Sequence, residues 1–204
     1  MEMVNTIINL FIAVGTLSVA ILAIWGDWVR SRLAGPRLSV VPQNFRGTFM
    51  RRKNNAGVIF YLLRVMNSRD WVSATNCRVM LKTMWRRDPD GIFKEVHLAC
   101  PLVFVWSPSE ITPAYLTLRR DHVLDFGKIE EGSDHFLPQL HVYTGNFDGY
   151  VRANEAVRYG LEIESDNFIS PHLQVFEVTW NGKWSEDPDR MSENLKIREV
   201  TTER

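Results

Sequence analysis

Cysteine is scarce in this chain. The 204 residues include only two, Cys77 and Cys100, whereas a secreted domain that depends on disulfides usually carries more. The sequence therefore gives no support to a disulfide framework. We expect two buried thiols, because a cysteine at an inward strand position behaves as a small hydrophobic residue. One disulfide between the two, or a redox role, is the alternative.

Motifs of catalysis and metal binding are also missing. The chain has no Gly-x-x-x-x-Gly-Lys-Ser/Thr, no Gly-x-Gly-x-x-Gly after a strand and no Gly-x-Ser-x-Gly, which mark nucleotide-binding proteins and many hydrolases. In Asp121-His122 and Asp134-His135 the side chains would point to opposite faces of a strand, so neither is a ready acid–base pair. We expect no enzyme, no metal and no cofactor. The histidines are expected in exposed loops, at positions 97, 122, 135, 141 and 172.

Net charge is absent too, since 24 Lys and Arg residues balance 24 Asp and Glu residues. A neutral chain has no general attraction for nucleic acid or for acidic substrates, so we expect no nucleic-acid partner. The charges are not evenly spread, however. Residues 27–53 contain seven basic residues against one acidic residue, Asp27, which gives this segment a net charge of +6.

A long uncharged stretch runs from Met3 to Gly26. Its residues 4–25 match the roughly 20 apolar residues that span the hydrocarbon core of a bilayer, where a single segment satisfies its backbone only as a helix. Trp25 and Trp28 follow at the edge, where indole rings favour the headgroup layer. We therefore predict a single-pass transmembrane helix. A cleaved signal peptide is the alternative, but the first three residues lack Lys and Arg and no small-x-small cleavage pattern follows.

Basic residues follow this helix on one side only. Arg30, Arg32 and Arg37 lie within a dozen residues of Trp25, so their charges can reach anionic lipid headgroups across a screening length of roughly 8 Å. We assign these three arginines to headgroup contact with the lipid bilayer. By the positive-inside rule, the N-terminus lies outside and the C-terminal domain lies in the cytoplasm.

Small side chains recur within the helix at spacings of three and four residues. Residues so spaced share one face of a helix, and small side chains let helices approach closely in lipid. The stripe predicts packing against another helix, and hence a homo-oligomer. The simpler interpretation is that alanine is common in transmembrane helices. The stripe consists of Ala13, Thr16, Ala20 and Ala23.

Gly35-Pro36 divides the chain into two parts, because both residues stop a helix. Residues 1–34 hold the helix and its basic juxtamembrane stretch, and residues 35–204 form one domain. In this domain apolar residues alternate, as they do in half-buried strands. The alternation is clearest at the odd positions of residues 59–65, 77–85 and 157–163.

Asn181-Gly182 is the most specific turn signal, because a two-residue hairpin turn needs positive φ at both positions. It predicts that the strand ending at Trp180 pairs with a short strand starting at Lys183. Roughly eight to ten short strands with no long amphipathic helix favour an all-β sandwich.

Three segments of the domain carry a resemblance to a known family. Two of them, FYLLRVMN at 60–67 and ATNCRVML at 74–81, are similar to the strand, Asn turn and Ala-x-Asn strand of bacterial immunoglobulin-like domains of the cell-adhesion-related type. VLDFGKIEEGS at 123–133 is similar to their leucine, glycine and acidic-turn element. The resemblance implies an immunoglobulin-like β-sandwich but no particular activity, since such sandwiches host many roles. It also implies a location outside the cell, which is the alternative to the cytoplasmic assignment.

Paired basic residues are the other charge clusters of the chain. With Trp85 and Trp106, these residues could form a site for an anionic ligand. The simpler interpretation is a solvated rim at the ends of strands. The residues are Arg51, Arg52 and Lys53, expected in a loop between the first two strands, and Arg86, Arg87, Arg119 and Arg120.

These features favour a non-catalytic, membrane-anchored binding or assembly module. The helix would hold the β-sandwich at the cytoplasmic membrane surface, where the sandwich recruits a protein partner or a second copy. The alternative is a ligand-gated membrane sensor or effector that signals by helix association. An enzyme would need a compact polar cluster assembled from distant segments.

Overall fold

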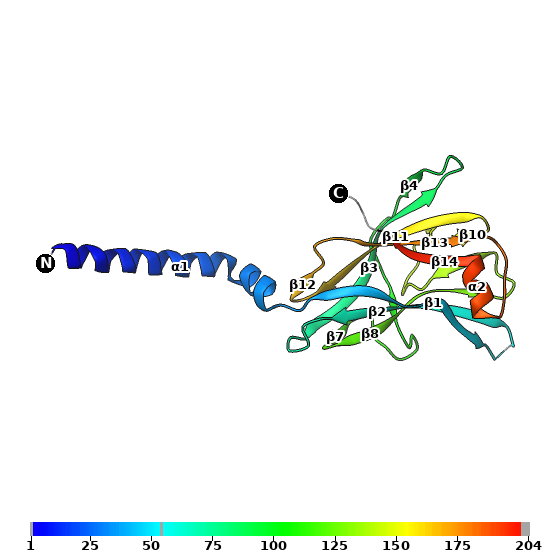
Figure 1. Ribbon diagram of the computed structural model, residues 1–204, viewed down its shortest axis with the longest axis horizontal. Helices are drawn as coiled ribbons and strands as arrows, with labels where there is room; N and C mark the ends of the chain where they lie inside the picture. Colours follow the sequence, from blue (N-terminus) through cyan, green and yellow to red (C-terminus); the bar gives the residue numbers. More distant parts are fainter. Residues whose placement is uncertain (1, 54, 201–204) are drawn as a thin grey trace.

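The computed structural model describes residues 2–53 and 55–200, and the side chains at 2, 3, 22, 24 and 27–34 lie outside that description. One long helix projects from one end of a β-sandwich (Figure 1). The N-terminus is at the free end of this helix. The described chain thus consists of one projecting helix and one globular β-sandwich domain.

Helix α1, Glu2–Ala34, contains 33 residues and is therefore about 50 Å long. Its window Val4–Ile21 is apolar, and none of it is buried against the sandwich. By length and composition this helix can cross a membrane. It ends at Ala34, directly before Gly35-Pro36, because proline cannot continue the helical hydrogen bonding.

The first sheet of the sandwich is antiparallel and has the order β1-β2-β8-β9-β10, with β6 paired to β8. Between β1 and β2, the backbone N–H of Arg52 donates to the carbonyl oxygen of Ala56 at 3.0 Å. The bounds are β1 Leu38–Arg51, β2 Gly57–Asn67, β6 Val105–Trp106, β8 Asp121–Glu130, β9 His135–Pro138 and β10 Val151–Arg152.

The second sheet, also antiparallel, has the order β14-β13-β11-β3-β4. Strand β12 pairs with β11, and β5 and β7 pair with β3. A short helix, α2, Pro188–Asn194, precedes the last strand. The bounds are β3 Ala74–Arg87, β4 Phe93–Val96, β5 Leu102–Val103, β7 Leu116–Leu118, β11 Glu155–Ser165, β12 Phe168–Ile169, β13 Gln174–Trp180 and β14 Leu195–Val200.

Six strands form the centre of an immunoglobulin-like arrangement. Strands β1-β2-β8 lie in one sheet and β13-β11-β3 in the other, which is the A-B-E and G-F-C order of an immunoglobulin sandwich. The all-β sandwich with one N-terminal helix is therefore confirmed. The described residues contain 14 strands, more than expected, because several are only two residues long. The resemblance to the bacterial family itself stays a prediction.

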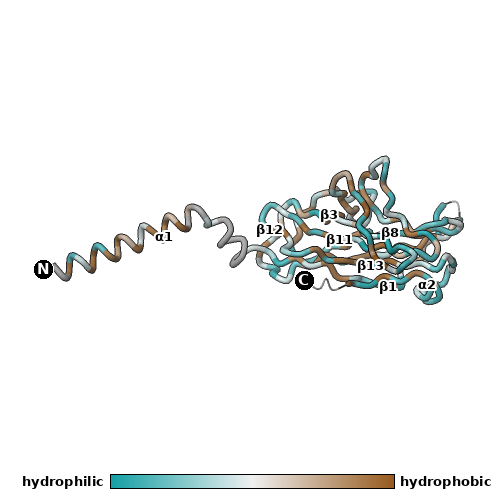
Figure 2. The backbone as a smooth tube through the Cα atoms, turned by 90° about the horizontal axis from the view of Figure 1, so that it is seen from above, coloured by the Kyte–Doolittle hydropathy of each residue, from teal (hydrophilic) through white to brown (hydrophobic). Residues whose placement is uncertain are grey.

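The alternation predicted from the sequence places the core in β2 and β11. Every predicted inward residue of these two strands is at most 2% exposed. Figure 2 shows hydrophobic and hydrophilic residues interspersed along the strands of the sandwich. The buried residues are Ile59, Tyr61, Leu63 and Val65 in β2, and Val157, Tyr159, Leu161 and Ile163 in β11.

In β3 the alternation changes phase. The pairing with β11 passes from Thr83 to Leu81 across a register shift, which makes Lys82 the extra residue of a β-bulge. Beyond the bulge, Met84 is fully buried, whereas Thr83 and Trp85 are partly exposed. The inward positions predicted for Thr83 and Trp85 are therefore wrong.

The turn at Asn181-Gly182 does not form the predicted hairpin. Gly182 has φ of +87°, but Asn181 is not in the positive-φ region that a two-residue turn requires. The chain instead continues through α2, and Leu195 of β14 then lies opposite Trp180 of β13. The partner strand is thus β14, not a strand starting at Lys183.

The two cysteines have different environments. Cys77 is buried in β3, Cys100 is exposed before β5, and both are free thiols. Burial raises the pKa of the Cys77 thiol to about 12. The expectation of two buried thiols is correct for Cys77 and wrong for Cys100, because the segment that carries Cys100 runs over the surface.

A side chain from the second sheet covers the edge of the first. Gln174 accepts a hydrogen bond from the backbone N–H of Val40 at 2.6 Å and donates one to the Val40 carbonyl oxygen at 2.9 Å. Val40 lies in β1, the edge strand of its sheet. The Gln174 amide therefore makes both hydrogen bonds that a neighbouring strand would make at this residue.

Candidate functional site

The junction between α1 and the sandwich is built around Asn67, which is only 6% exposed. Its amide oxygen accepts hydrogen bonds from the backbone N–H groups of Arg37 and Arg69, both at 3.1 Å. Its amide nitrogen donates to the carbonyl oxygens of Val72 at 2.6 Å and Arg119 at 3.1 Å. An amide has two donor hydrogens and two acceptor lone pairs, so all four are used.

The residues that leave the helix are packed onto the same junction. Gly35 and Pro36 are buried, and the guanidinium of Arg69 donates to the carbonyl oxygen of Gly35 at 2.9 Å. The backbone N–H of Ser68 donates to the carbonyl oxygen of Arg37 at 2.9 Å. Buried, hydrogen-bonded backbone is the opposite of a flexible linker. The helix and the sandwich are therefore joined by a fixed connection.

The end of the sandwich at this junction, the helix-side end, carries several exposed arginines. Arg37 is exposed, whereas the side chains of Arg30 and Arg32 lie outside the described residues. Arg119 and Arg120 are also exposed. They lie at the same end because Asn67 donates hydrogen bonds to both of their carbonyl oxygens, from its side-chain amide to Arg119 and from its backbone N–H to Arg120. The helix-side end consists of residues 35–37, 68–73, 119–121 and 166–169.

The small-residue stripe of α1 is open to its surroundings. All four of its side chains are exposed. The hydroxyl of Thr16 donates to the carbonyl oxygen of Ile12 at 2.8 Å, so this polar group is satisfied within its own helix. The face is therefore free to contact lipid or a second helix. The stripe is Ala13, Thr16, Ala20 and Ala23.

The basic residues at 51–53 lie at the opposite end of the sandwich, the far end, which includes Arg52, Ala56 and α2. The 14 residues of β1 place Arg51 about 40 Å from Leu38. Arg51 pairs with Glu186 at 2.9 Å, and Arg52 pairs with Glu130 at 2.7 Å, while Lys53 is exposed. The basic residues that lie close together in the sequence are thus divided between the two ends of the sandwich. At the far end, acidic side chains neutralise most of their charge.

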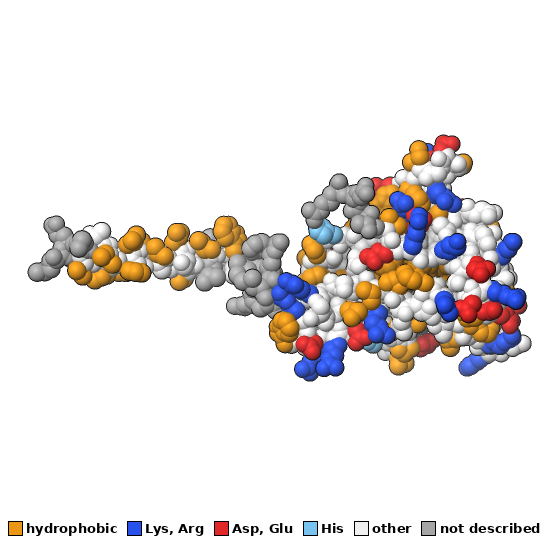
Figure 3. Space-filling view, in the orientation of Figure 1, with side chains coloured by type: hydrophobic (Ala, Val, Ile, Leu, Met, Phe, Trp, Pro, Cys, Tyr) orange, Lys and Arg blue, Asp and Glu red, His pale blue; other side chains and the backbone are white. Residues whose placement is uncertain are grey.

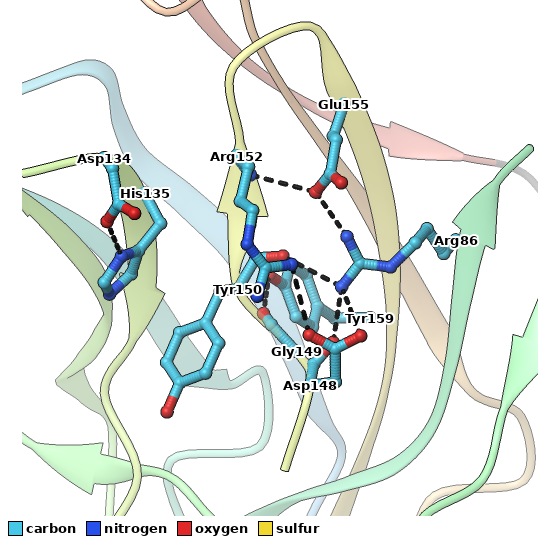
Figure 4. A network of polar contacts seen from close by, with 9 residues as sticks. All are labelled: Arg86, Asp134, His135, Asp148, Gly149, Tyr150, Arg152, Glu155 and Tyr159. Carbon is cyan, nitrogen blue, oxygen red and sulfur yellow. Dashed lines mark hydrogen bonds and ion pairs between the residues drawn. The ribbon is translucent and has the colours of Figure 1, made fainter. Parts of the chain in front are cut away.

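Arg86 belongs to a polar network at the start of β11 (Figure 4). It forms an ion pair with Glu155 and donates to the carbonyl oxygens of Asp148 at 2.6 Å and Tyr150 at 3.2 Å. Its charge is therefore already compensated inside the protein. Arg87 is exposed at the end of β3.

Trp106 does not join the basic residues. It is fully buried, and its indole N–H donates to the carbonyl oxygen of Ala114 at 3.2 Å. The structure does not bring Arg51, Arg52 and Lys53 together with Arg86 and Arg87 around the two tryptophans. An anionic-ligand site formed by these residues stays a hypothesis, because the residues do not line one common cleft.

The same network surrounds the hydroxyl of Tyr159, which donates to the carbonyl oxygen of Gly149 at 2.5 Å (Figure 4). Burial raises the pKa of Tyr159 well above its ordinary value of 10. Immunoglobulin sandwiches have a similar bond, from a tyrosine near the start of strand F to the upstream backbone. We assign the network a structural role, which is to hold the segment before β11 against the sandwich.

Asp134 and His135 do form a pair, contrary to the expectation from the sequence. His135 Nδ1 lies 2.5 Å from Asp134 Oδ1, and its ring packs against Tyr150 with centroids 4.7 Å apart. Asp134 precedes β9 and is not in a strand, so strand alternation does not separate the two side chains. The hydrogen bond from His135 lowers the pKa of Asp134. The Asp134 side chain is 85% exposed, so the pair lies on an open surface.

The outer face of the second sheet carries further ion pairs. Lys82 contacts Glu162 at 2.7 Å and Glu164 at 3.2 Å, and Arg78 contacts Glu164 at 2.8 Å. The hydrogen bonds from Arg78 and Lys82 outweigh burial and lower the pKa of Glu164. Cross-strand charge pairs of this kind stabilise a solvated sheet face. Two shallow, open hollows lie over this face, and the described residues contain no His, Cys, Asp and Glu group that could hold a metal.

Comparison of the chain with protein-family models, with curated proteins and with solved structures finds no match.

Proposed function

We propose that this protein is a non-catalytic, membrane-anchored binding or assembly module. Helix α1 spans the bilayer once, and the sandwich at the membrane surface recruits a protein partner or a second copy of the chain. The observation that carries the proposal is the bare helix, whose apolar window Val4–Ile21 has no residue buried by the sandwich. An uncovered apolar surface of this size needs lipid or another helix around it.

The charges next to α1 support an orientation with the N-terminus outside and the sandwich in the cytoplasm. Arg30, Arg32 and Arg37 fall within the 15 to 20 residues over which the positive-inside rule operates. Glu2 is the charged residue on the other side of the helix. The basic residues at 51–53 are too distant to contribute.

Membrane attachment and orientation can be tested together in membranes from cells that make the full chain. We expect the protein to resist extraction with alkaline carbonate, and a tag after Arg204 to be digested only when the cytoplasmic face is open to protease. Release by carbonate would exclude the membrane anchor. Digestion from the outer face would reverse the orientation and leave the anchor intact.

Assembly is tested by affinity purification of the full chain in mild detergent, followed by mass spectrometry and size measurement. We expect a protein partner in stoichiometric amount, or a homo-oligomer. A monomer that purifies alone, without a protein or small molecule, would contradict the assembly role.

A second candidate function is a ligand-gated membrane sensor, and the fixed junction favours it. Because Asn67 and Arg69 hold residues 35–37 on the sandwich, a reorientation of the domain would be transmitted to α1. Helix association that changes with an added small molecule supports this function, and association that never changes excludes it.

A further inference from the structure

We propose that the helix-side end of the sandwich docks on the bilayer surface by contact with anionic lipid headgroups. The domain then rests on the membrane and does not stand free of it. This inference depends on the proposed membrane anchor, which brings the bilayer to this end. The docking surface consists of the exposed residues Arg37, Trp71, Arg119, Arg120 and Ile169.

The position of this surface relative to α1 is the first argument. Strand β12, which carries Ile169, is the part of the sandwich nearest to α1 in both views (Figures 1 and 2). The amide of Asn167 donates to the carbonyl oxygen of Ser73 at 3.0 Å, which places β12 beside the loop that carries Trp71. The two apolar residues therefore belong to one end of the domain.

The distance to the bilayer is also suitable. Residues 26–34 of α1 extend about 13 Å beyond Trp25. The headgroup layer occupies roughly 5 to 8 Å of this length. The remaining gap of about 5 to 8 Å does not exceed the screening length of roughly 8 Å, so arginines at the helix-side end feel the headgroup charge.

Unpaired charge is the second argument. Arg37 and Arg119 form no ion pair within the part of the chain that the structure describes. Arg119 donates one hydrogen bond to the carbonyl oxygen of Asp70 at 3.4 Å, and Arg120 forms an exposed ion pair with the Asp70 carboxylate at 4.0 Å, which leaves the other donors of both groups open. These guanidinium groups remain available for lipid phosphates, which arginine binds well. The arginines of the far end are instead neutralised inside the protein: Arg46 by Asp189, Arg51 by Glu186 and Arg52 by Glu130.

Exposed apolar side chains are the third argument. Trp71 is 71% exposed and Ile169 is 67% exposed, and the guanidinium of Arg69 lies 5.9 Å from the centre of the Trp71 ring. Tryptophan next to arginine is typical of protein surfaces at the headgroup layer. Figure 3 shows basic and hydrophobic side chains together at the end of the domain beside the helix. The surface thus suits an anionic interface better than bulk water.

The proposal can be tested on the full chain in nanodiscs of phosphatidylcholine alone or mixed with phosphatidylglycerol. Cys100→Ser removes the exposed thiol, and a nitroxide is then attached through Ile169→Cys, Ile92→Cys or Leu17→Cys. Paramagnetic accessibility to oxygen and to a water-soluble nickel chelate reports whether each label is in lipid or in water. Ile92, 60% exposed in the turn between β3 and β4, is the aqueous control.

We expect the label at 169 to be shielded from nickel in anionic nanodiscs and exposed in neutral ones, while the label at 92 stays aqueous in both. Replacing Arg119 and Arg120 by glutamine should reduce the ratio of docked to undocked domain about 30-fold, which corresponds to about 1 kcal/mol for each arginine. The matched pair Arg46→Gln and Arg51→Gln should have no effect.

The proposal is overturned if the label at 169 is as accessible to nickel as the label at 92 in anionic nanodiscs. It is also overturned if the far-end pair of substitutions releases the domain as strongly as the helix-side pair. The label at Leu17 tests the anchor separately. If that label is in water, the proposed function fails; if it is in lipid while the label at 169 is in water, only the docking fails.

Discussion

Asn67 accepts a hydrogen bond from the backbone N–H of Arg37 at 3.1 Å, across 30 residues of chain and three residues beyond the end of α1. The same side chain holds the loop 68–73 and the segment just before β8. One buried amide therefore joins the helix exit, two strands and a loop. The following prediction tests how much of the stability of the domain depends on it.

Asn67→Ala should lower the free energy of unfolding by roughly 3 kcal/mol, because it leaves several buried backbone groups without a partner. Chemical denaturation of the full chain in detergent, followed by tryptophan fluorescence, measures the change. Gln43→Ala, on an exposed part of β1, is the control and should change stability by less than about 0.5 kcal/mol. Equal effects of the two substitutions would show that the junction is not a stabilising centre.

Two buried tyrosines give a matched test of the network around β11. Tyr159→Phe removes the bond to Gly149 and should cost about 1 to 2 kcal/mol of unfolding free energy. Tyr61→Phe removes a buried hydroxyl that has no partner in the described structure, so it should be neutral or slightly stabilising. Denaturation midpoints of the two variants measure these changes in stability. A larger loss for Tyr61→Phe would contradict the role assigned to the Tyr159 bond.

Helix association through the small-residue stripe is tested inside α1. If this face packs against a second helix, Ala20→Leu separates the two backbones and weakens the oligomer far more than Ile21→Leu on another face. Cross-linking yields in membranes compare the variants. If both variants give the same cross-linking yield, the stripe only reflects the usual abundance of alanine in transmembrane helices.

The topology of the chain should depend on the arginines next to α1 and not on those at the far end of β1. Replacing Arg30, Arg32 and Arg37 by glutamine should weaken or invert insertion, because the positive-inside signal is lost. Replacing Arg51, Arg52 and Lys53 should leave insertion unchanged. A reporter fused after Arg204 gives the readout. If the first set has no effect, the cytoplasmic assignment should be withdrawn, although the helix would still be an anchor.

The buried carboxyl of Asp125 predicts a pH dependence of stability. Burial raises its pKa above the ordinary 3.8, a hydrogen bond with Ser107 partly opposes this, and Glu110 adds a smaller increase. Because the folded-state pKa is the higher one, the stabilisation from protonated Asp125 is present below the unfolded-state pKa and is lost as pH rises through the folded-state value.

Asp125→Asn, which has no charge at any pH, should therefore be more stable than the parent at pH 7. The difference should shrink as pH falls through the raised folded-state pKa of Asp125 and should be gone below about 4, the unfolded-state pKa. Urea midpoints across this range measure the effect. Asp121→Asn, at the exposed start of β8, should show no such gain. A gain for Asp125→Asn that persists unchanged at low pH would point to packing instead of charge.

Sequence patterns predicted the parts of this fold that are governed by local physical chemistry. The uncharged run of α1, the stop at Gly35-Pro36 and the alternation in β2 and β11 depend on neighbouring residues only. The bulge at Lys82 could not be predicted, because it arises where β3 fits β11 and changes the phase of a pattern that looked regular. The hairpin at Asn181-Gly182 failed for a related reason, since Trp180 pairs with a residue beyond α2.

The candidate site was harder to predict than the fold. Asn67 looked like an ordinary turn residue, and its role appears only when β1, β8 and the loop 68–73 meet around it. The segment with Arg37 and Arg51 looked like one basic cluster, but an extended strand carries its charges to opposite ends of the domain. Exposure of Trp71 likewise depends on tertiary contacts, so the sequence alone gave no reason to select it.

The double hydrogen bond between Gln174 and Val40 affects how neighbouring chains can meet. Domains held on one membrane encounter each other edge-on at high local concentration, which favours pairing between strands of different molecules. Gln174 occupies the N–H and the carbonyl oxygen of Val40, which such intermolecular pairing would need at this point of β1. A partner that binds by adding a strand is thereby directed away from this part of β1 and toward the other sheet edges, which are β10, β4 and β14. One glutamine thus blocks strand addition at Val40 of β1.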